Sequence, residues 1–339
     1  YDGAGRILTN GQSLSESVVS YAYDAEGQRT QMVVNGETTA YAYDAAGRLT
    51  NLTVSSFSIP LSSFAYGWHP NADLIQGVGF PGGASVSNNY DVLGRLTGKY
   101  NLNSTGSVVS SFAYGYNAVG LRTNVVESDG GGKNYSYDEL YQVAEALGYL
   151  SGGGSDTNYQ YDYRYDLIGN YTQVVRQTVL ENYYPNNLNQ YATSSIPSVP
   201  STASYLYDAN GNMLYDGNQY YNWDEESRLA SVTNGSDHSE FVYNGMSWLV
   251  ERREYTNGTL DETVRYVYDG LMSVAEKNES NDLMRTYVRG LDMSLTADGA
   301  GGIGGLLSIV QSPMSQVGYY FYDGNGNVVD LVDTNDAVV

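Results

Sequence analysis

The chain has 339 residues, with 16 basic against 38 acidic side chains, a formal charge of −22, no cysteine and two histidines. So acidic a protein repels phosphate, which argues against nucleic acid and anionic membrane surfaces as partners. The lack of cysteine excludes disulfides and thiolate metal sites. No apolar run reaches the length of a membrane span, so this segment is not expected to insert into a membrane.

A short pattern recurs from the first residue to the last twenty, and its clearest copy lies at residues 41–50. Tyr41 and Tyr43 are two positions apart, so both rings lie on one face of a strand. Asp44 is suited to accept hydrogen bonds from the backbone of a turn, and Gly47 to adopt the positive φ that closes it. Each copy is therefore predicted to be a β-hairpin whose return strand begins near Arg48.

The copies follow one another without a break that marks a domain boundary, so residues 1–339 are predicted to form one array. Looser copies replace Asp by Asn, or Gly by another residue that tolerates a turn. The residues predicted to form the structural turns and ladders are Tyr23, Asp24, Gly27, Tyr43, Asp44, Gly47, Arg48, Asp91, Gly94, Arg95, Asp166, Gly169, Asp208, Gly211, Asp323 and Gly326.

Three stretches depart from the pattern. Residues 55–83 are predicted to be long loops or an edge, because prolines cannot donate to a sheet ladder; these prolines are Pro60, Pro70 and Pro81. Residues 194–201 contain Pro197 and Pro200 and are predicted to be a stiff loop. Residues 138–147 are the only stretch for which a short helix is considered.

Tyrosine is unusually abundant, with 35 tyrosines against six phenylalanines. Its ring stacks on cross-strand neighbours while its hydroxyl stays in water, which suits a single sheet with both faces wet. About fourteen hairpins at roughly 4.8 Å per strand make a strip on the order of 130 Å long. So long a strip, poor in bulky aliphatic residues, is expected to curl around a wide, wet interior and not around a solid core.

The pattern Tyr-x-Tyr-Asp-x-x-Gly-Arg-Leu resembles the YD repeat of the RHS family, bacterial polymorphic-toxin shells related to the teneurin barrel. Residues 265–332 resemble the RHS-associated core, with Tyr268-Asp269, Arg289-Gly290-Leu291-Asp292, a glycine run at 299–305 and Tyr322-Asp323 in that order. The resemblance implies an all-β fold in which hairpins form one long curled sheet, a spiral shell or barrel-like cocoon. It also implies a bacterial protein that is secreted or on the cell surface.

Candidate chemistry is scarce. Residues 208–212 and 323–327 carry alternating oxygen ligands as in a calcium loop, but both lack the glycine and glutamate that complete one, so structural turns explain them. His69 and His238 are the only bases for a serine nucleophile, and both are interpreted as surface residues, His238 in a turn. We therefore assign no catalytic residue, metal site or cofactor. The glycine run at 299–305 is interpreted as a close-packed loop.

Two functions remain open from the sequence. The first is a non-enzymatic shell that encloses or presents a polypeptide cargo, a variable toxin encoded after Val339. The second is an extracellular structural, adhesive or fibre-forming surface protein that uses the same sheet to bind glycans or neighbouring copies of itself. A short variable domain following the repeats favours the shell, and further repeats with an anchor favour the surface protein.

Overall fold

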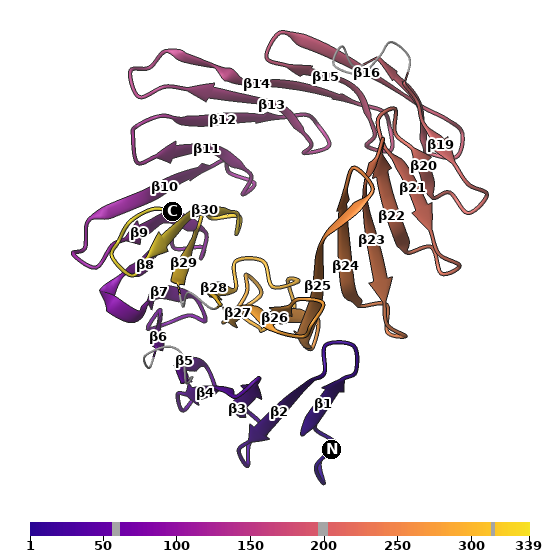
Figure 1. Cartoon of the computed structure of the whole chain (residues 1–339). Coiled ribbons are helices and arrows are strands. Elements are labelled where there is room, and N and C mark those ends of the chain that lie inside the picture. Colours follow the sequence, from indigo (N-terminus) through magenta and orange to yellow (C-terminus); the bar gives the residue numbers. More distant parts are fainter. Residues whose placement is uncertain (56–61, 196–202, 313–315) are drawn as a thin grey trace. The chain divides into compact units, whose positions relative to one another are not determined.

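The computed structural model describes residues 1–55, 62–195, 203–312 and 316–339 (Figure 1). Within these ranges every regular element is a β-strand except one 3-10 turn, η1 (Pro81–Gly83). In the same ranges no helix combines the length and hydrophobicity needed to cross a bilayer. The predicted all-β fold is confirmed.

The contacts divide the chain into two compact units. Unit 1 comprises residues 1–111, 243–252 and 262–339, and unit 2 comprises residues 112–242 and 253–261. The repeat continues through both, and the proposal of a single array stays a prediction.

The strands that lie wholly in unit 1 come from both ends of the chain. They are β1 (Thr9–Gln12), β2 (Ser17–Tyr23), β3 (Arg29–Val34), β4 (Glu37–Tyr43), β5 (Leu49–Ser55), β6 (Ser62–Trp68), β7 (Ile75–Gly79), β8 (Ser85–Tyr90), β9 (Leu96–Leu102), β26 (Met272–Lys277), β27 (Leu283–Arg289), β28 (Leu306–Gln311), β29 (Gln316–Tyr322) and β30 (Val328–Asp333).

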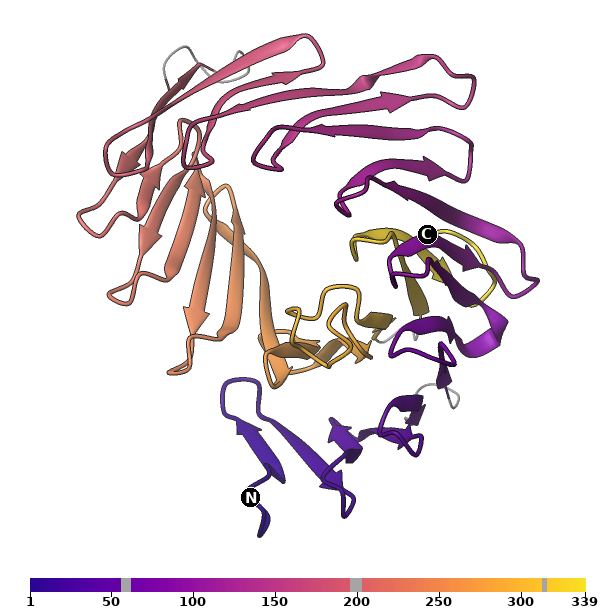
Figure 2. The ribbon, with the colours of Figure 1, turned by 180° about the vertical axis from the view of Figure 1, so that it is seen from behind.

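The strands of unit 2 come from the middle of the chain (Figures 1 and 2). They are β11 (Arg122–Glu127), β12 (Gly132–Tyr137), β13 (Val143–Tyr149), β14 (Ser155–Tyr165), β15 (Tyr171–Arg176), β16 (Val179–Pro185), β17 (Tyr191–Ser195), β18 (Ala203–Ser204), β19 (Leu206–Tyr207), β20 (Met213–Tyr215), β21 (Tyr220–Trp223) and β22 (Leu229–Asn234). Successive strands pair from β11 to β18 and from β19 to β22, whereas β18 and β19 belong to different sheets. Four strands contain a unit boundary: β10 (Val108–Tyr116), β23 (Asp237–Tyr243), β24 (Leu249–Thr256) and β25 (Thr259–Asp269).

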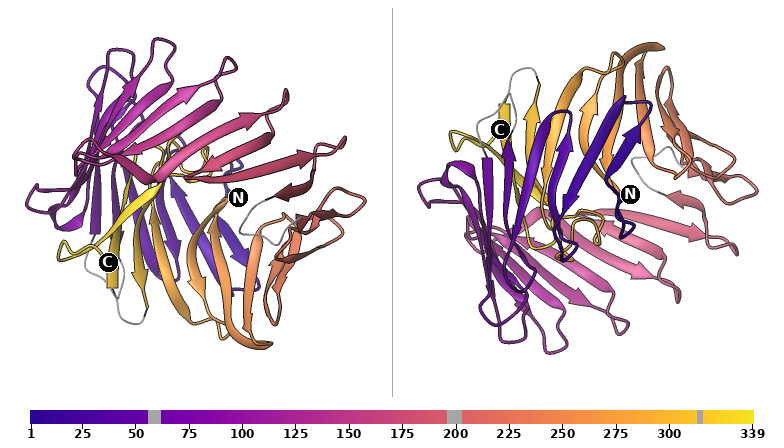
Figure 3. Two further views of the ribbon diagram at one scale, coloured as in Figure 1. Left: turned by 90° about the horizontal axis from the view of Figure 1, so that it is seen from above. Right: turned by 90° about the horizontal axis from the view of Figure 1, so that it is seen from below.

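Strands β1–β18 belong to one sheet and β19–β30 to a second. Pairing is antiparallel and mostly between successive strands, as in β4 with β5 or β14 with β15. The two further views in Figure 3 show the same succession of hairpins. This pairing is the result expected when each turn is short, because a tight turn brings only antiparallel neighbours together.

The hairpin turn is built by one carboxylate. Asp44 Oδ1 accepts hydrogen bonds from the backbone N–H of Ala46 (2.9 Å) and Arg48 (3.0 Å), and its Oδ2 accepts one from Arg48 Nε (2.8 Å). The backbone closes the turn through Gly47 N to Asp44 O (2.9 Å). The register shifts between Ala42 and Tyr43, as a bulge requires. Hydrogen bonds from the backbone and side chain of Arg48 lower the pKa of Asp44.

The same geometry recurs along the chain. The turn glycines Gly47, Gly94, Gly169 and Gly211 have φ of 81°, 77°, 92° and 91°, in agreement with the predicted left-handed turn position. In the looser copies the corresponding residues also have positive φ, and these are Tyr141 (63°), Asn189 (61°) and Ser227 (57°). The turn therefore depends more on this backbone conformation than on the identity of one residue.

Replacing Gly47 by valine is expected to lower the free energy of unfolding by about 1–3 kcal/mol, because a β-branched side chain is strained at positive φ. A Cβ at this position would also lie 3.0 Å from the side-chain nitrogen of Gln28. Urea denaturation measures the change. The matched control is Ala45→Val, since Val92 occupies the corresponding, fully exposed position in the copy at Asp91. Equal midpoints for the two variants would contradict the expectation.

The prediction of long loops or an edge at residues 55–83 is wrong for the part that the structure describes. Strands β6 and β7 form a regular hairpin there, and each has partners on both sides. Pro70 lies in the turn and Pro81 in η1, so neither removes a donor from the ladder. Pro60 lies outside the described residues, as do Pro197 and Pro200 of the predicted stiff loop.

The short helix considered at residues 138–147 is also wrong. Asp138 accepts hydrogen bonds from the backbone N–H of Leu140 and Gln142, which makes the repeat turn, and β13 follows. This strand pairs with both β12 and β14. Pairing on both edges outweighs the weak local helix preference of the sequence.

A solid core exists in unit 1, contrary to the expectation for the whole chain. Phe64 and Phe321 are fully buried and belong to one cluster with Leu52 and Val332. Phe80 meets the Phe321 ring edge to face at 5.5 Å. Composition did not reveal this core because its members are spread over strands more than 200 residues apart, with one or two in each.

Unit 2 agrees better with the expected thin sheet. Among its described residues, the buried apolar side chains are few: Tyr114, Val125, Ala146 and Val174. Both hydrophobic clusters found in the described part of the chain belong to unit 1. Stability in unit 2 must therefore come largely from the sheet ladder and from ring contacts on its faces.

Candidate functional site

The second tyrosine of the repeat links neighbouring hairpins through its hydroxyl. Tyr43 Oη donates to the backbone carbonyl of Arg29 (2.9 Å), Tyr137 to that of Arg122 (2.7 Å) and Tyr165 to that of Val143 (2.8 Å). The acceptor is in each case five residues after the Asp or Asn of the preceding turn. A tryptophan makes the same bond with its indole N–H in two copies, Trp68 to Leu49 and Trp223 to Met213.

This link replaces the aromatic contact that we expected for some repeat tyrosines. In the described part of the chain, no ring pair involves Tyr43, Tyr137 or Tyr207. Tyr207 instead donates to the carbonyl of Tyr191 (3.1 Å) in the preceding hairpin. No sequence pattern indicates this role, because the acceptor is a backbone atom that any residue can supply.

An aromatic ladder does form in unit 2, from other members of the repeat. Tyr163, Tyr171, Tyr183 and Tyr191 come from four successive strands, β14 to β17. Their ring centroids are 5.6, 6.4 and 5.2 Å apart in turn. We call these four residues the tyrosine ladder. Such spacings are those of favourable offset or tilted ring pairs.

The ladder is polar as well as aromatic. Tyr183 Oη donates to Glu181 (2.9 Å), and Tyr191 Oη accepts from the backbone N–H of Tyr171 (2.9 Å). Burial, then the neighbouring phenols, raise the pKa of Tyr163. Burial raises that of Tyr183, with Glu181 adding to the effect. Tyr163 and Tyr183 therefore keep their protons at physiological pH, and the ladder presents half-buried rings with hydroxyls.

The predicted arginines lie beside carboxylates and rings. Arg95 Nε donates to Asp91 of its own turn (2.7 Å), and the Arg48 guanidinium also lies 5.2 Å from the centre of the Trp68 ring. Where Asp is replaced by Asn, as at Asn117, the residue four positions on is not an arginine but Leu121. A turn Asp does not require this arginine, since Asn170 Nδ2 donates to the Asp166 carboxylate from the same position.

The two histidines belong to different units, His69 to unit 1 and His238 to unit 2. His69 follows β6 in a loop, where its Nδ1 accepts a 3.3 Å hydrogen bond from the Asn71 backbone. His238 lies in β23, so the predicted turn at this residue is wrong; its ring stacks on Tyr255 at 4.0 Å. No group of three potential metal ligands occurs among the described residues. Asp208 and Asp323 use both carboxylate oxygens as acceptors within their own turns.

The glycine-rich segment of unit 1 is organised by a residue that the sequence analysis did not single out for a role. Asp292 is 2% exposed and its carboxylate accepts from the backbone N–H of Ser294 (2.8 Å), Ala300 (2.6 Å) and Gly302 (3.2 Å), and from the Ser294 hydroxyl. Burial raises the pKa of Asp292, but these donors outweigh it and the net pKa is lowered. Residues 291–305, hereafter the Asp292 loop, are thus a closely hydrogen-bonded loop.

Solved structures of TcdB2-TccC3 share this fold. The TcdB2-TccC3-TEV structure matches 95% of this chain with a TM-score of 0.75 at 16% identity, over 17% of its own chain. The TcdB2-TccC3-Cdc42 structure matches 95% with a TM-score of 0.73 at 16% identity, over 18% of its own chain. These likenesses support an RHS-like fold.

Sequence relatives are distant. The chain is 24% identical over 267 residues to a tRNA3(Ser)-specific nuclease WapA of Bacillus spizizenii, and 25% identical over 222 residues to the tRNA nuclease WapA of Bacillus subtilis. These matches cover 67% and 53% of this chain. They span only 11% and 9% of the two relatives. No family model matches the chain.

Proposed function

We propose that this chain is part of a YD-repeat shell that encloses or presents a polypeptide cargo, and that these residues catalyse no reaction. The observation that carries the proposal is the fold, which matches toxin-complex structures over 95% of the chain. One of those structures is TcdB2-TccC3 without its hypervariable C-terminal region. By analogy, the cargo here is a variable toxin segment encoded after Val339.

The tyrosine ladder supports contact with a polypeptide. Rigid rings bury a large area at little cost in conformational entropy, and their hydroxyls serve the polar groups of many different chains. Unit 2 has few buried apolar side chains in its described part, so its ring faces are available to a partner. A cargo of variable sequence requires such a tolerant surface.

The nuclease activity of the WapA relatives is not assigned to this chain, because the match spans about a tenth of their length. We propose instead that catalysis belongs to the cargo. A toxin shell acts on other cells, so we propose that the protein is secreted by a bacterium or held on its surface. The alternative is an adhesive surface protein in which the same sheets bind glycans or further copies.

The test is protection of the cargo in the full-length polypeptide that contains this chain. The segment after Val339 is expected to survive a trypsin concentration that digests the same segment expressed alone. Purified residues 1–339 are expected to leave tRNA intact. Equal digestion rates would contradict enclosure and favour the adhesive function, and cleavage of tRNA by residues 1–339 would contradict a non-enzymatic role.

Two variants at neighbouring tyrosines distinguish loss of the tyrosine ladder from general destabilisation of the protein. Tyr183→Ala removes a ladder ring, whereas Tyr184→Ala removes the next residue, which is 53% exposed and points to the opposite face of β16. We expect Tyr183→Ala to release the cargo for digestion several-fold faster and Tyr184→Ala to leave the rate unchanged, with melting temperatures of both recorded as a check. Identical digestion rates for the two variants would show that the tyrosine ladder is not part of the surface that contacts the cargo.

A further inference from the structure

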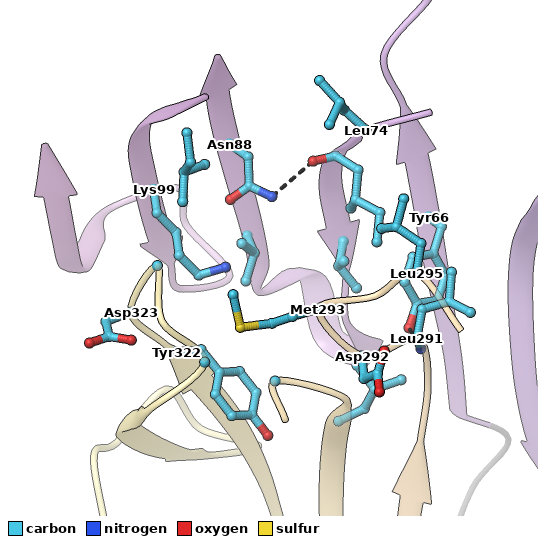
Figure 4. A pocket seen from close by; sticks show the side chains of 18 of the residues that line it. Tyr66, Leu74, Asn88, Lys99, Leu291, Asp292, Met293, Leu295, Tyr322 and Asp323 are labelled. Carbon is cyan, nitrogen blue, oxygen red and sulfur yellow. Dashed lines mark hydrogen bonds between the residues drawn. The ribbon is translucent and has the colours of Figure 1, made fainter. Parts of the chain in front are cut away.

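Unit 1 contains a partly open pocket of about 310 Å³ between strands β7–β9 and the Asp292 loop (Figure 4). Its walls are mainly apolar and include Leu74, Val78, Phe80, Leu96, Leu295 and Leu307. We call it the Lys99 pocket. Volumes of this order are those of sites that bind small organic groups.

Lys99 lies in the wall of this apolar pocket without a close partner. Among the described residues, no hydrogen bond or ion pair reaches its ammonium group. The carboxylate of Asp323 acts on it through its charge, and this carboxylate also accepts hydrogen bonds from Asn325 and Asn327 of its own turn. Burial lowers the pKa of Lys99 to about 8. An ammonium group in such a place is stabilised by any anion that reaches it.

Asn88 supplies a second uncommitted group beside it (Figure 4). The side chain is 8% exposed, and its Nδ2 donates to the carbonyl of Ile75 (2.9 Å). This bond fixes the orientation of the amide, because the carbonyl can only accept. Asn88 Oδ1 is buried and has no partner. Buried acceptors nearly always accept a hydrogen bond, so we expect a bound molecule to supply the donor for this oxygen.

Three other polar side chains of the pocket already make hydrogen bonds within the protein. Tyr66 Oη accepts from the backbone N–H of Leu291 (3.1 Å), and Tyr322 Oη donates to the carbonyl of Leu306 (2.6 Å). The Asp292 carboxylate is saturated by its own loop. A ligand therefore meets mainly apolar walls, the ammonium group of Lys99 and the unpaired oxygen of Asn88. Tyr90, Tyr320 and Asp323 also line the pocket, and the Asp323 carboxylate accepts hydrogen bonds within its own turn.

We propose that the Lys99 pocket binds the C-terminal residue of a polypeptide when that residue is aliphatic. Its side chain fills the apolar pocket, its carboxylate accepts from Lys99, and its backbone N–H donates to Asn88 Oδ1. A plain fatty acid lacks the N–H, and an internal peptide residue lacks the negative charge. The site does not depend on the shell function, since it uses only residues of unit 1.

The test is calorimetric titration of residues 1–339 with matched probes. N-acetyl-L-leucine has all three features, N-acetyl-L-leucinamide lacks the charge and 4-methylpentanoate lacks the N–H. We expect each of the last two to bind at least tenfold more weakly than N-acetyl-L-leucine. We expect N-acetyl-Ala-Ala-Leu to bind at least as tightly as N-acetyl-L-leucine. Failure of this tripeptide to bind would contradict the proposal that the ligand is the end of a polypeptide.

Variants assign the two contacts. Lys99→Met is expected to abolish the preference for carboxylate over amide, Lys99→Arg to retain it, and Asn88→Leu to abolish the preference over 4-methylpentanoate. Lys133→Met, in unit 2, is the control and should bind as wild type. Binding of N-acetyl-L-leucine that is undetectable at millimolar concentration, or unaltered by Lys99→Met in a protein with a native circular dichroism spectrum, would overturn the proposal.

A pH series gives an independent check. The affinity for N-acetyl-L-leucine is expected to fall as the pH rises above about 8, because Lys99 loses its charge there. The other ionisable groups facing the pocket are Asp292, Asp323 and four tyrosines whose pKa values are raised by burial, namely Tyr66, Tyr90, Tyr320 and Tyr322. None of these tyrosines loses its proton near pH 8, so Lys99→Met should bind equally at pH 7 and pH 9.

Discussion

Replacing Phe321 by alanine is expected to lower the free energy of unfolding of unit 1 by about 3–5 kcal/mol. The side chain is fully buried and lies edge to face with Phe80, so its removal leaves a cavity at the centre of the cluster formed with Phe64 and Val332. A chain organised only as a thin sheet, wet on both faces, would lose much less. The measurement is urea denaturation combined with amide hydrogen exchange.

The control is Val328→Ala, at the start of β30, where the side chain is 53% exposed and a change below about 0.5 kcal/mol is expected. Hydrogen exchange locates the effect, because β5 and β6 of unit 1 should exchange faster in Phe321→Ala while β15 of unit 2 should not. Similar denaturation midpoints for Phe321→Ala and Val328→Ala would show that the cluster does not stabilise unit 1.

Replacing Asp292 by alanine is expected to lower the free energy of unfolding by about 2–4 kcal/mol, because three part-buried backbone donors and the Ser294 hydroxyl lose a charged acceptor. The control is Asp298→Ala in the same loop, whose carboxylate makes no hydrogen bond among those of the described structure. Thermal and urea denaturation give the change in stability. Equal stabilities of the two variants would contradict the central role of Asp292.

The effect of Asp292→Ala should also depend on pH. The pKa of Asp292 is lower in the folded protein than in the unfolded chain, so the ionised carboxylate stabilises the fold fully above its ordinary value of about 4. This stabilisation is lost as the pH falls through the lower, folded pKa. The stability difference between wild type and Asp292→Ala should therefore shrink from pH 6 towards pH 3, and a constant difference would argue against the carboxylate as the cause.

The sequence by itself determined the hairpin. All atoms that build the turn lie within five residues, since Asp44 binds the backbone of Ala46 and Arg48 and Gly47 supplies the positive φ. Such short-range hydrogen bonds form wherever the same residue types recur at the same spacing, so one good copy predicted the others. The loops predicted at residues 55–83 rested on proline, and the helix considered at residues 138–147 rested on local helix preference. Both were wrong because neither took account of the strands that pair with these segments.

Only the tertiary structure decided which faces are buried and which groups meet. Phe64 and Phe321 belong to one core although they are 257 positions apart in the numbering, and Gln12 pairs with the backbone of Tyr268 through both atoms of its amide (2.7 and 2.9 Å). The Lys99 pocket likewise joins β7–β9 to the Asp292 loop. A repeat makes every hairpin look alike in sequence, and the difference between a solid core and a tyrosine ladder arises from the partner that each sheet face finds.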